Sequence, residues 1–453
     1  MLRKIRLTFA MICFVLITLL FLDFTGTLHG WFGWLAKIQF LPAVLALNVG
    51  VILFLVILTL VCGRIYCSVI CPLGVFQDIL AWLGRQPKKR RKLPYSYSPA
   101  LSWLRYGVLG VFIIALIAGI GSLAALLAPY SAYGRIANNL FQPIWQWGNN
   151  LLAYLAERAD SYAFYETDVW LKSLPTFIIA AATLAVLVVL AGRNGRTYCN
   201  TICPVGTVLG FLSRYSLFRI TIDSEKCNQC SLCSRNCKAD SEQINETRRS
   251  FFTATALVAA TSVLKAQEKK VDGGLAAIED KKIPERSTPL TPPGSLSARN
   301  MAQHCTACQL CVSACPNQVL RPSADLRKLM QPEMSYERGY CRPECTKCSE
   351  VCPAGAIRPI TKADKSSVQI GHAVWVKKNC IPLTDGVQCG NCARHCPTGA
   401  IQMVPSIPED KDSPKIPVIN VERCIGCGAC ENLCPARLFS AIYVEGHERH
   451  RII

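Results

Sequence analysis

The chain has 453 residues, 26 of them cysteine, and a formal net charge of +19. It is 51% hydrophobic but only 17% charged, and its positive mean hydropathy indicates that part of it lies in a bilayer. So many thiols in a long chain exclude the small disulfide-stapled scaffold of secreted proteins and favour metal ligands. The excess of Lys and Arg fits either nucleic-acid binding or the cytoplasmic anchors of a membrane protein, and its distribution decides between the two.

Four uncharged apolar stretches in the first half are long enough for membrane helices. A bilayer core takes about 20 apolar residues as a helix, and helices of a soluble core are rarely apolar all round over such a length. The stretches are residues 7–22, 40–62, 106–130 and 173–192. We therefore expect residues 1–222 to form an α-helical membrane bundle with four spans.

The basic residues of the first half orient this bundle. Of the 24 Lys and Arg residues within positions 1–249, 20 lie in segments that would share one side of the membrane. The other four are Lys37, Arg135, Arg158 and Lys172, in the loops of the opposite side. The positive-inside rule places the N-terminus and the basic run at 88–92 in the cytoplasm. The charge therefore marks topology, and we expect no nucleic-acid partner.

Residues 245–266 combine Arg248 and Arg249 with about 15 uncharged residues rich in Ala and Thr. The segment is short for a spanning helix but resembles a twin-arginine signal, which addresses folded proteins for export. An ordinary fifth transmembrane helix and a soluble cytoplasmic helix are the alternatives. Residues 267–300 follow as a charged and Pro-rich linker, and residues 301–453 form a cysteine-rich domain.

Twenty of the cysteines fall into five groups of four. Three groups have the spacing C-x2-C-x2-C-x3-C, two are variants of it, and all but the first are followed by Pro. This is the run with which bacterial ferredoxins bind [4Fe–4S] clusters, because three cysteines in a tight loop can each reach a separate iron. The groups are Cys227, Cys230, Cys233, Cys237; Cys305, Cys308, Cys311, Cys315; Cys341, Cys345, Cys348, Cys352; Cys380, Cys389, Cys392, Cys396; and Cys424, Cys427, Cys430, Cys434.

Zinc is the alternative for any single group, but structural zinc sites usually join two C-x2–4-C pairs across a longer gap. No C-x-x-C-H is present, so c-type haem is not expected. The four downstream groups predict α+β ferredoxin-like modules, arranged as two interleaved dicluster ferredoxin units. We expect the first downstream group to pair with the fourth and the second with the third, each pair exchanging its last cysteines; pairing in sequence order is the alternative. Residues 223–244 would hold a separate cytoplasmic cluster.

A second cysteine motif is repeated in the first half. GRIYCSVICPLGVF begins at Gly63 and GRTYCNTICPVGTV at Gly195, with eight of fourteen positions identical. Cysteines four residues apart lie on one face of a helical turn, and the Pro that follows breaks the helix. The repeat predicts pseudo-symmetric halves that bring four thiols together to hold a further Fe–S centre, to form redox-active disulfides, or only to pack. These cysteines are Cys67, Cys71, Cys199 and Cys203.

Together these motifs resemble two families. Residues 1–240 are similar to the NapH (MauN) type of membrane ferredoxin in their four spans and paired C-x3-C-P motifs. Residues 245–453 are similar to the NapG (MauM) type, with a twin-arginine signal before four cluster motifs. Two features depart from the pattern: NapH-type proteins carry two cytoplasmic cluster groups where this chain has one, and Lys238 follows Cys237 where Pro is usual.

The resemblance implies a fusion of the two families that passes electrons from quinol through [4Fe–4S] clusters to a periplasmic reductase or cytochrome. The five cysteine groups predict five clusters, and the resemblance implies quinone as substrate and the lipid and quinone pool of a bacterial inner membrane as surroundings. The N-terminus would be cytoplasmic and the ferredoxin domain periplasmic. No catalytic residue or quinone site is evident. The alternatives are a transmembrane electron wire fed by a cytoplasmic donor and an accessory protein that matures a periplasmic metalloenzyme.

Overall fold

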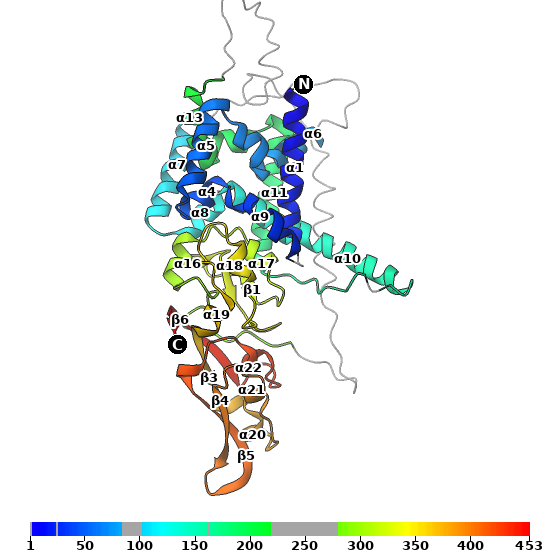
Figure 1. Ribbon diagram of the computed structural model, residues 1–453, viewed down its shortest axis with the longest axis vertical. Coiled ribbons are helices and arrows are strands. Elements are labelled where there is room, and N and C mark those ends of the chain that lie inside the picture. The colour runs from blue at the N-terminus through cyan, green and yellow to red at the C-terminus, as the bar shows by residue number, and fades with distance from the viewer. Residues whose placement is uncertain (1, 24–25, 84–101, 162, 219–279) are drawn as a thin grey trace, which may run out of the picture.

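The computed structural model describes residues 2–23, 26–83, 102–161, 163–218 and 280–453. The cysteine group from Cys227 to Cys237 and the paired arginines at 248–249 lie outside the described residues. The described chain has three parts, which follow one another along an elongated molecule (Figure 1). They are a helical half (residues 2–218), a first ferredoxin module (298–367) and a second ferredoxin module (368–452).

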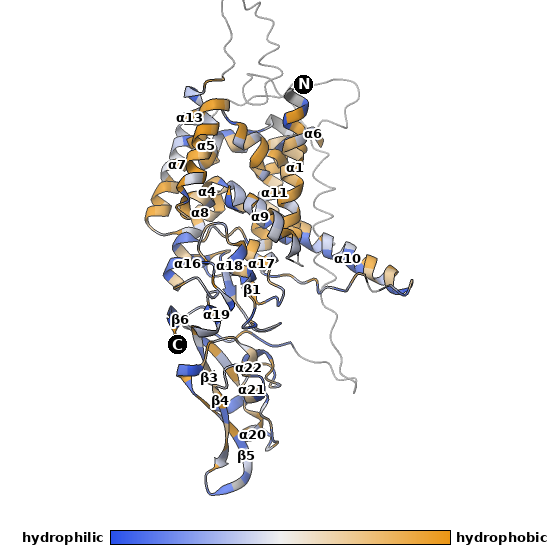
Figure 2. Cartoon of the chain, in the orientation of Figure 1, coloured by the Kyte–Doolittle hydropathy of each residue, from blue (hydrophilic) through white to orange (hydrophobic). Residues whose placement is uncertain are grey.

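The helical half is strongly apolar, in contrast to the two modules (Figure 2). Two of its helices contain segments long and apolar enough to cross a membrane, Lys4–Leu22 and Leu174–Gly192. The helices are α1 (Leu2–Leu22), α2 (Thr27–Phe32), α3 (Trp34–Lys37), α4 (Phe40–Leu45), α5 (Val49–Cys62), η1 (Tyr66–Ile70), α6 (Pro72–Leu83), α7 (Ser102–Ile117), α8 (Gly121–Leu127), α9 (Pro129–Ile136), η2 (Ala137–Phe141), α10 (Gln142–Glu157), α11 (Leu174–Asn194), α12 (Thr197–Thr201), α13 (Pro204–Leu212) and η3 (Ser213–Tyr215).

The expected span over residues 40–62 is broken. Leu47 takes a positive φ of 51°, which ends the helical path after α4. The side chain of Asn48 then caps α5 by accepting a hydrogen bond from the N–H of Val51 over 3.3 Å. Asn at this position satisfies a helix donor that would otherwise have no partner, so a new helix begins here.

The expected span over residues 106–130 is broken as well. Gly119, with a φ of 72°, separates α7 from α8, and Pro129 opens α9 with its fixed φ and missing N–H. Residues 40–62 and 106–130 are therefore not single continuous helices. Apolar composition is nearly uniform across these positions, whereas the breaks depend on single residues that set the local backbone.

Each ferredoxin module consists of short helices and two-stranded antiparallel sheets. In the first module β1 (Leu320–Pro322) pairs with β2 (Pro332–Met334), and in the second β4 (Ile401–Ile407) pairs with β5 (Asp410–Ile419) and β3 (Val368–Trp375) with β6 (Ile442–Ile452). The helices are α16 (Ala298–His304), α17 (Leu310–Ser313), η4 (Leu326–Lys328), α18 (Lys347–Val351), α19 (Lys362–Ser367), η5 (Lys377–Asn379), α20 (Ile381–Thr384), α21 (Asn391–Arg394), η6 (Val421–Arg423) and α22 (Ala429–Asn432).

Residues 280–297, here called the strap, pack against the second module before the chain enters the first. The Lys281 ammonium donates to the carbonyl oxygens of Glu431 and Asn432 over 2.8 and 2.6 Å. Arg286 forms an ion pair with the Glu431 carboxylate over 2.5 Å, with both side chains less than a tenth exposed. At its far end the strap reaches β6 through an isolated bridge between Ser297 and Arg449.

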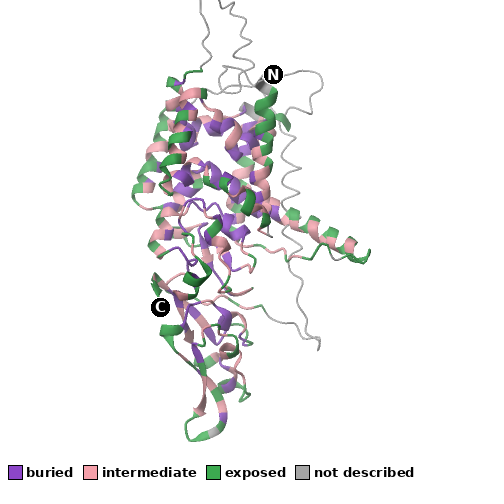
Figure 3. Ribbon diagram, viewed as in Figure 1, coloured by how far each residue is buried: buried purple, intermediate pink, exposed green. Residues whose placement is uncertain are grey.

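The helical half and the first module share one core. Figure 3 shows buried residues continuing from the helices into the first module. Polar groups also cross this boundary, because the side chains of Asn138 and Asn139 both donate to the side-chain oxygen Oε1 of Gln309, over 3.0 and 2.9 Å. All three side chains are buried. The first module is thus seated directly on the helices.

Candidate iron–sulfur sites

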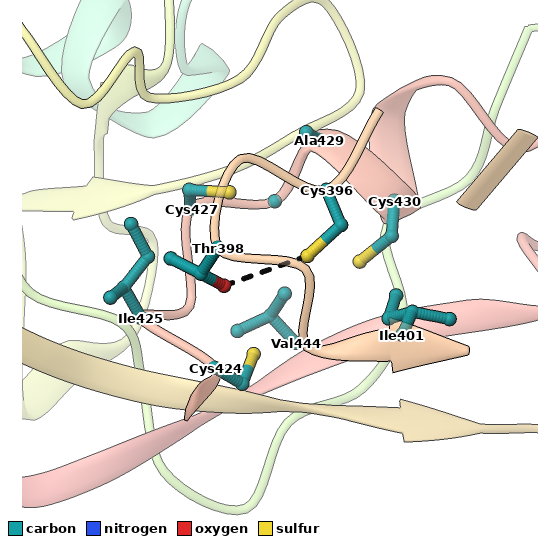
Figure 4. Close-up of a pocket in the computed structure, with 10 residues that line it drawn as sticks. Cys396, Thr398, Ile401, Cys424, Ile425, Cys427, Ala429, Cys430 and Val444 are labelled. Atoms are coloured by element: carbon teal, nitrogen blue, oxygen red, sulfur yellow. Dashed lines mark hydrogen bonds between the residues drawn. The ribbon is translucent and has the colours of Figure 1, made fainter. Parts of the chain in front are cut away.

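Four thiols of the second module line one pocket, which we call site C. They are Cys396, Cys424, Cys427 and Cys430. Figure 4 shows their sulfur atoms turned towards a common interior, with Thr398 and Val444 beside them. Cys424 and Cys427 lie in the loop before α22, Cys430 lies in α22 itself, and Cys396 comes from the preceding cysteine group.

The reciprocal arrangement forms a second pocket in the same module, site D. Its thiols are Cys380, Cys389, Cys392 and Cys434. Here the fourth cysteine comes from the last group of the chain. The two groups of the second module therefore exchange their last cysteines, as in dicluster ferredoxins.

The first module repeats this exchange. Cys352 interacts electrostatically with the thiols of Cys305, Cys308 and Cys311, which together make site A. Cys315 lies among the thiols of the other group, and this set makes site B. Its members are Cys315, Cys341, Cys345 and Cys348.

These sets correct the expected pairing of the cysteine groups. The exchange of last cysteines is present, but it joins neighbours in the sequence; the expected pairing of the first downstream group with the fourth, and of the second with the third, is wrong. The hairpins β1–β2 and β4–β5 give the physical reason, because each folds the chain back between two successive groups. Closing such a short loop costs less entropy than bringing together groups about a hundred residues apart.

The chemistry of sites A to D fits [4Fe–4S] clusters. Each site offers four thiols, and backbone N–H groups donate to several of the sulfurs, as from Ala400 to Cys396 and from Ala441 to Cys434, both over 3.3 Å. Such hydrogen bonds stabilise negative charge on sulfur and tune cluster potential. Burial raises the pKa of Cys427 to about 12, so this thiol keeps its proton at neutral pH until a metal displaces it.

The repeated motif of the helical half also brings its four cysteines together. Cys67, Cys71, Cys199 and Cys203 are all buried, and each interacts electrostatically with others of the set. We call them the bundle thiol set. The two copies match in conformation, since Cys71 and Cys203 have nearly the same extended backbone before the Pro that starts α6 and α13.

Polar groups hold the bundle thiol set between the two repeats. The Gln77 amide donates to the Cys199 sulfur over 3.3 Å. Arg64 of the first repeat donates to Asn200 of the second over 3.1 Å. Arg196 forms a two-point ion pair with Asp78, which follows the first repeat. All four thiols are free in this structure, and the arrangement is compatible with each of the three roles predicted from the sequence: an Fe–S centre, redox-active disulfides, or packing alone.

The sequence placed Arg135 in a loop on the side of the membrane opposite the basic segments, whereas the structure places it in a helix. Its side chain is fully buried in α9, close to Cys308 and Tyr198. Lys172, assigned to the same side, donates to Asn138 and Gln142 over 2.6 Å each. The signal that could have located them is the polar and aromatic run PYSAYGRIANN at 129–139, which interrupts the apolar sequence.

Comparison with protein families confirms the iron–sulfur character of the chain. A family described as a 4Fe-4S dicluster domain matches residues 304–356, which span two successive cysteine groups, and residues 387–438, which span the last group and all of the preceding one except Cys380. A second family with the same description matches residues 223–319. A 4Fe-4S binding domain matches residues 44–91 and 174–222, which contain the repeated motif.

Known proteins similar to this chain are ferredoxin-type proteins. MauM of Methylobacillus flagellatus, a methylamine utilization ferredoxin-type protein, is 31% identical over 36% of this chain and 70% of its own length. NapG of Escherichia coli is 30% identical over 36% of this chain and 75% of its own. NapH of Haemophilus influenzae is 28% identical over 44% of this chain and 55% of its own. No solved structure is significantly similar.

Proposed function

This chain belongs to the family of ferredoxin-type proteins that includes MauM and NapG, and we propose that it carries electrons from membrane quinol to a periplasmic reductase. It is an iron–sulfur electron-transfer protein. In our proposal it joins a NapH-like membrane part to a NapG-like ferredoxin part, with the N-terminus in the cytoplasm and both modules in the periplasm. Nap-type relatives support a partner from a periplasmic reductase system.

The observation that carries this proposal is the order of the thiol sites along the molecule. Tyr198 interacts with the bundle thiol set on one side and with Arg135 on the other. Arg135 in turn interacts with Cys308 of site A. Sites A and B share the first module, and sites C and D share the second. Thiols of neighbouring sites interact from A to B, from B to C and from C to D, so the sites form a series through the parts of the chain that follow one another in Figure 1.

We assign one cluster to each of sites A to D and a fifth to the cysteine group from Cys227 to Cys237. Bound there, [4Fe–4S] clusters supply one-electron carriers. The protein's own part is to hold four thiolates at each site and to keep the sites in series. The bundle thiol set is assigned to a further redox centre at the quinol end, where Arg64 and Arg196 favour bound negative charge.

The test uses the full chain in detergent, with a menaquinol or ubiquinol analogue as the reductant and visible absorbance as the readout. We expect quinol to bleach the iron–sulfur absorbance of the wild type. Cys203→Ala removes one bundle thiol and should slow this bleaching at least tenfold. Cys62→Ala, in the same half but at an exposed position outside the set, is the matched control.

Dithionite distinguishes loss of clusters from loss of quinol oxidation. If dithionite bleaches the wild type and quinol does not, quinol is not the donor and a cytoplasmic donor replaces it. If Cys203→Ala responds to quinol as fast as Cys62→Ala, the bundle thiol set has no part in the reaction.

A further inference from the structure

Helix α9 lies directly against the backbone of site A. All eight of its residues are buried. A Cβ on Gly134 would stand 2.3 Å from the carbonyl oxygen of Cys308, so only glycine permits this approach. The backbone of a site A ligand is therefore in contact with α9, and side chains on this helix are close enough to act on site A.

Arg135 is a buried cation on this helix whose charge is only partly compensated. Its two terminal nitrogens donate to the carbonyl oxygens of Ala125 and Leu126, over 2.7 and 3.3 Å, at the end of α8. Within the described part of the chain, Nε has no hydrogen-bond partner and no ion pair includes Arg135. Its electrostatic neighbours are Tyr198 and Cys308. Burying an unpaired charge destabilises a fold, so an anion beside the Arg135 guanidinium would be stabilising.

Tyr130 presents a second donor to the same place. Its side chain is 2% exposed, and among the described residues its hydroxyl has no hydrogen-bond partner. It interacts electrostatically with two site A thiols, Cys308 and Cys352, one from each of the two cysteine groups that form this site. The ring packs against Phe21 with centroids 5.7 Å apart, which holds the hydroxyl in position.

We propose that the Tyr130 hydroxyl and the Nε–H of Arg135 donate hydrogen bonds to the cluster bound at site A. A cluster held by four thiolates is negatively charged and gains one more negative charge on reduction. Donors and a cation beside it stabilise the reduced form and raise its potential. The helical half therefore sets the potential of site A and makes it the entry point for electrons. The inference rests on the cluster assigned to site A in the proposed function.

Tyr133, one turn further along α9, provides a matched control. It is also buried, but its hydroxyl is already bonded to Thr18 of α1. Tyr133→Phe therefore removes the same atom from the same helix without removing a donor to site A.

The experiment is a redox titration of the full chain in detergent, with mediators and dithionite, followed by electron paramagnetic resonance. The signal of site A is the one that Cys305→Ala abolishes. We expect Tyr130→Phe to shift the reduced-to-oxidised ratio of this signal at least tenfold towards oxidised at the wild-type midpoint, a fall of about 59 mV for one electron. Arg135→Gln should produce at least the same shift, Arg135→Lys a smaller one, and Tyr133→Phe none.

The outcomes separate this inference from the proposed function, because quinol takes no part in the titration. If Tyr130→Phe keeps the wild-type iron content and midpoint, the inference is overturned whatever quinol does. If the midpoint falls but quinol bleaches nothing, the inference stands and the quinol function fails. Should Arg135→Gln lose iron, Tyr130→Phe still decides, since it removes a single oxygen atom.

Discussion

The backbone N–H of Cys341 donates a hydrogen bond to the carbonyl oxygen of Cys427 over 2.9 Å. This bond joins the cysteine loop of site B to that of site C, and so joins the two modules. Tyr336 strengthens the junction, because its buried hydroxyl donates to the carbonyl oxygen of Gly426 over 2.6 Å. Sites B and C, in the middle of the series, are therefore connected by a direct contact between their cysteine loops.

Gly428→Ala should disturb this junction. A Cβ at Gly428 would lie 2.2 Å from the ring of Tyr336, and the residue has a φ of 78°. The left-handed backbone costs an alanine about 1–2 kcal/mol, and the clash should add about 1–3 kcal/mol. We expect a lower Tm for loss of the visible absorbance and weaker magnetic coupling between reduced clusters. Gly386→Ala, with a φ of 67° and no atom within 4 Å of its Cβ, controls for the backbone cost. Equal effects in both variants would contradict the contact.

Double cysteine variants test the exchange in the second module. Cys396 and Cys424 belong to the same site, so Cys396→Ala/Cys424→Ala should lose one cluster, about four iron atoms per chain. Cys396→Ala/Cys380→Ala damages sites C and D together and should lose about eight. The measurement is iron per chain after purification without oxygen. The reverse result would mean that each group keeps its own fourth cysteine.

Gly134→Ala tests the packing contact between the first module and helix α9. The new methyl group would meet the Cys308 carbonyl oxygen at 2.3 Å and the Phe21 ring at 2.9 Å, so the two parts must separate. We expect amide hydrogen exchange to rise at least tenfold in α9 and the loop before α17. Gly110→Ala in α7, where nothing lies within 4 Å of the Cβ, should leave exchange unchanged there. Unchanged protection in Gly134→Ala would argue against direct contact.

Acid should destabilise the second module through His450. Burial, with a smaller contribution from His447, lowers the pKa of His450 to about 4, below the usual 6.5. In the unfolded chain this histidine binds a proton below about pH 6.5, whereas in the folded chain it does so only below about pH 4. The folded state therefore loses stability as the pH falls through this range. His450→Gln keeps a side chain that can hydrogen-bond to the Thr291 hydroxyl, the partner of His450 Nε2. At pH 4.5 this variant should regain on the order of 2 kcal/mol of the free energy of unfolding that the wild type loses in acid. At pH 7.5 His450 is uncharged in both the folded and the unfolded chain. A similar gain in the free energy of unfolding at that pH would contradict the assignment to His450.

Much of the candidate chemistry could be predicted from local spacing. The cysteine groups predict clusters because the spacing of a few residues fixes how three of the four cysteines are placed. The internal repeat likewise predicted that Cys67, Cys71, Cys199 and Cys203 meet, and they do. In both cases a short motif contains the information that the structure uses.

The remaining features depend on tertiary contacts that no local pattern encodes. The pairing of cysteine groups follows from where the hairpins β1–β2 and β4–β5 return the chain. The broken spans follow from Leu47 and Gly119, whose backbone angles hydropathy cannot reveal. Arg135 was expected in a loop because charged residues are usually exposed, but in the fold it is buried in α9 beside Cys308 of site A.

The strap has a consequence for how the chain is made. It is the first described segment of the ferredoxin region to leave the ribosome, yet its partners include the last described strand, β6: Arg286 donates to the carbonyl oxygen of Val444 over 2.8 Å. The second module can therefore close only after β6 has left the ribosome. Val444 also lines site C, so cluster insertion at this site should follow the synthesis of β6.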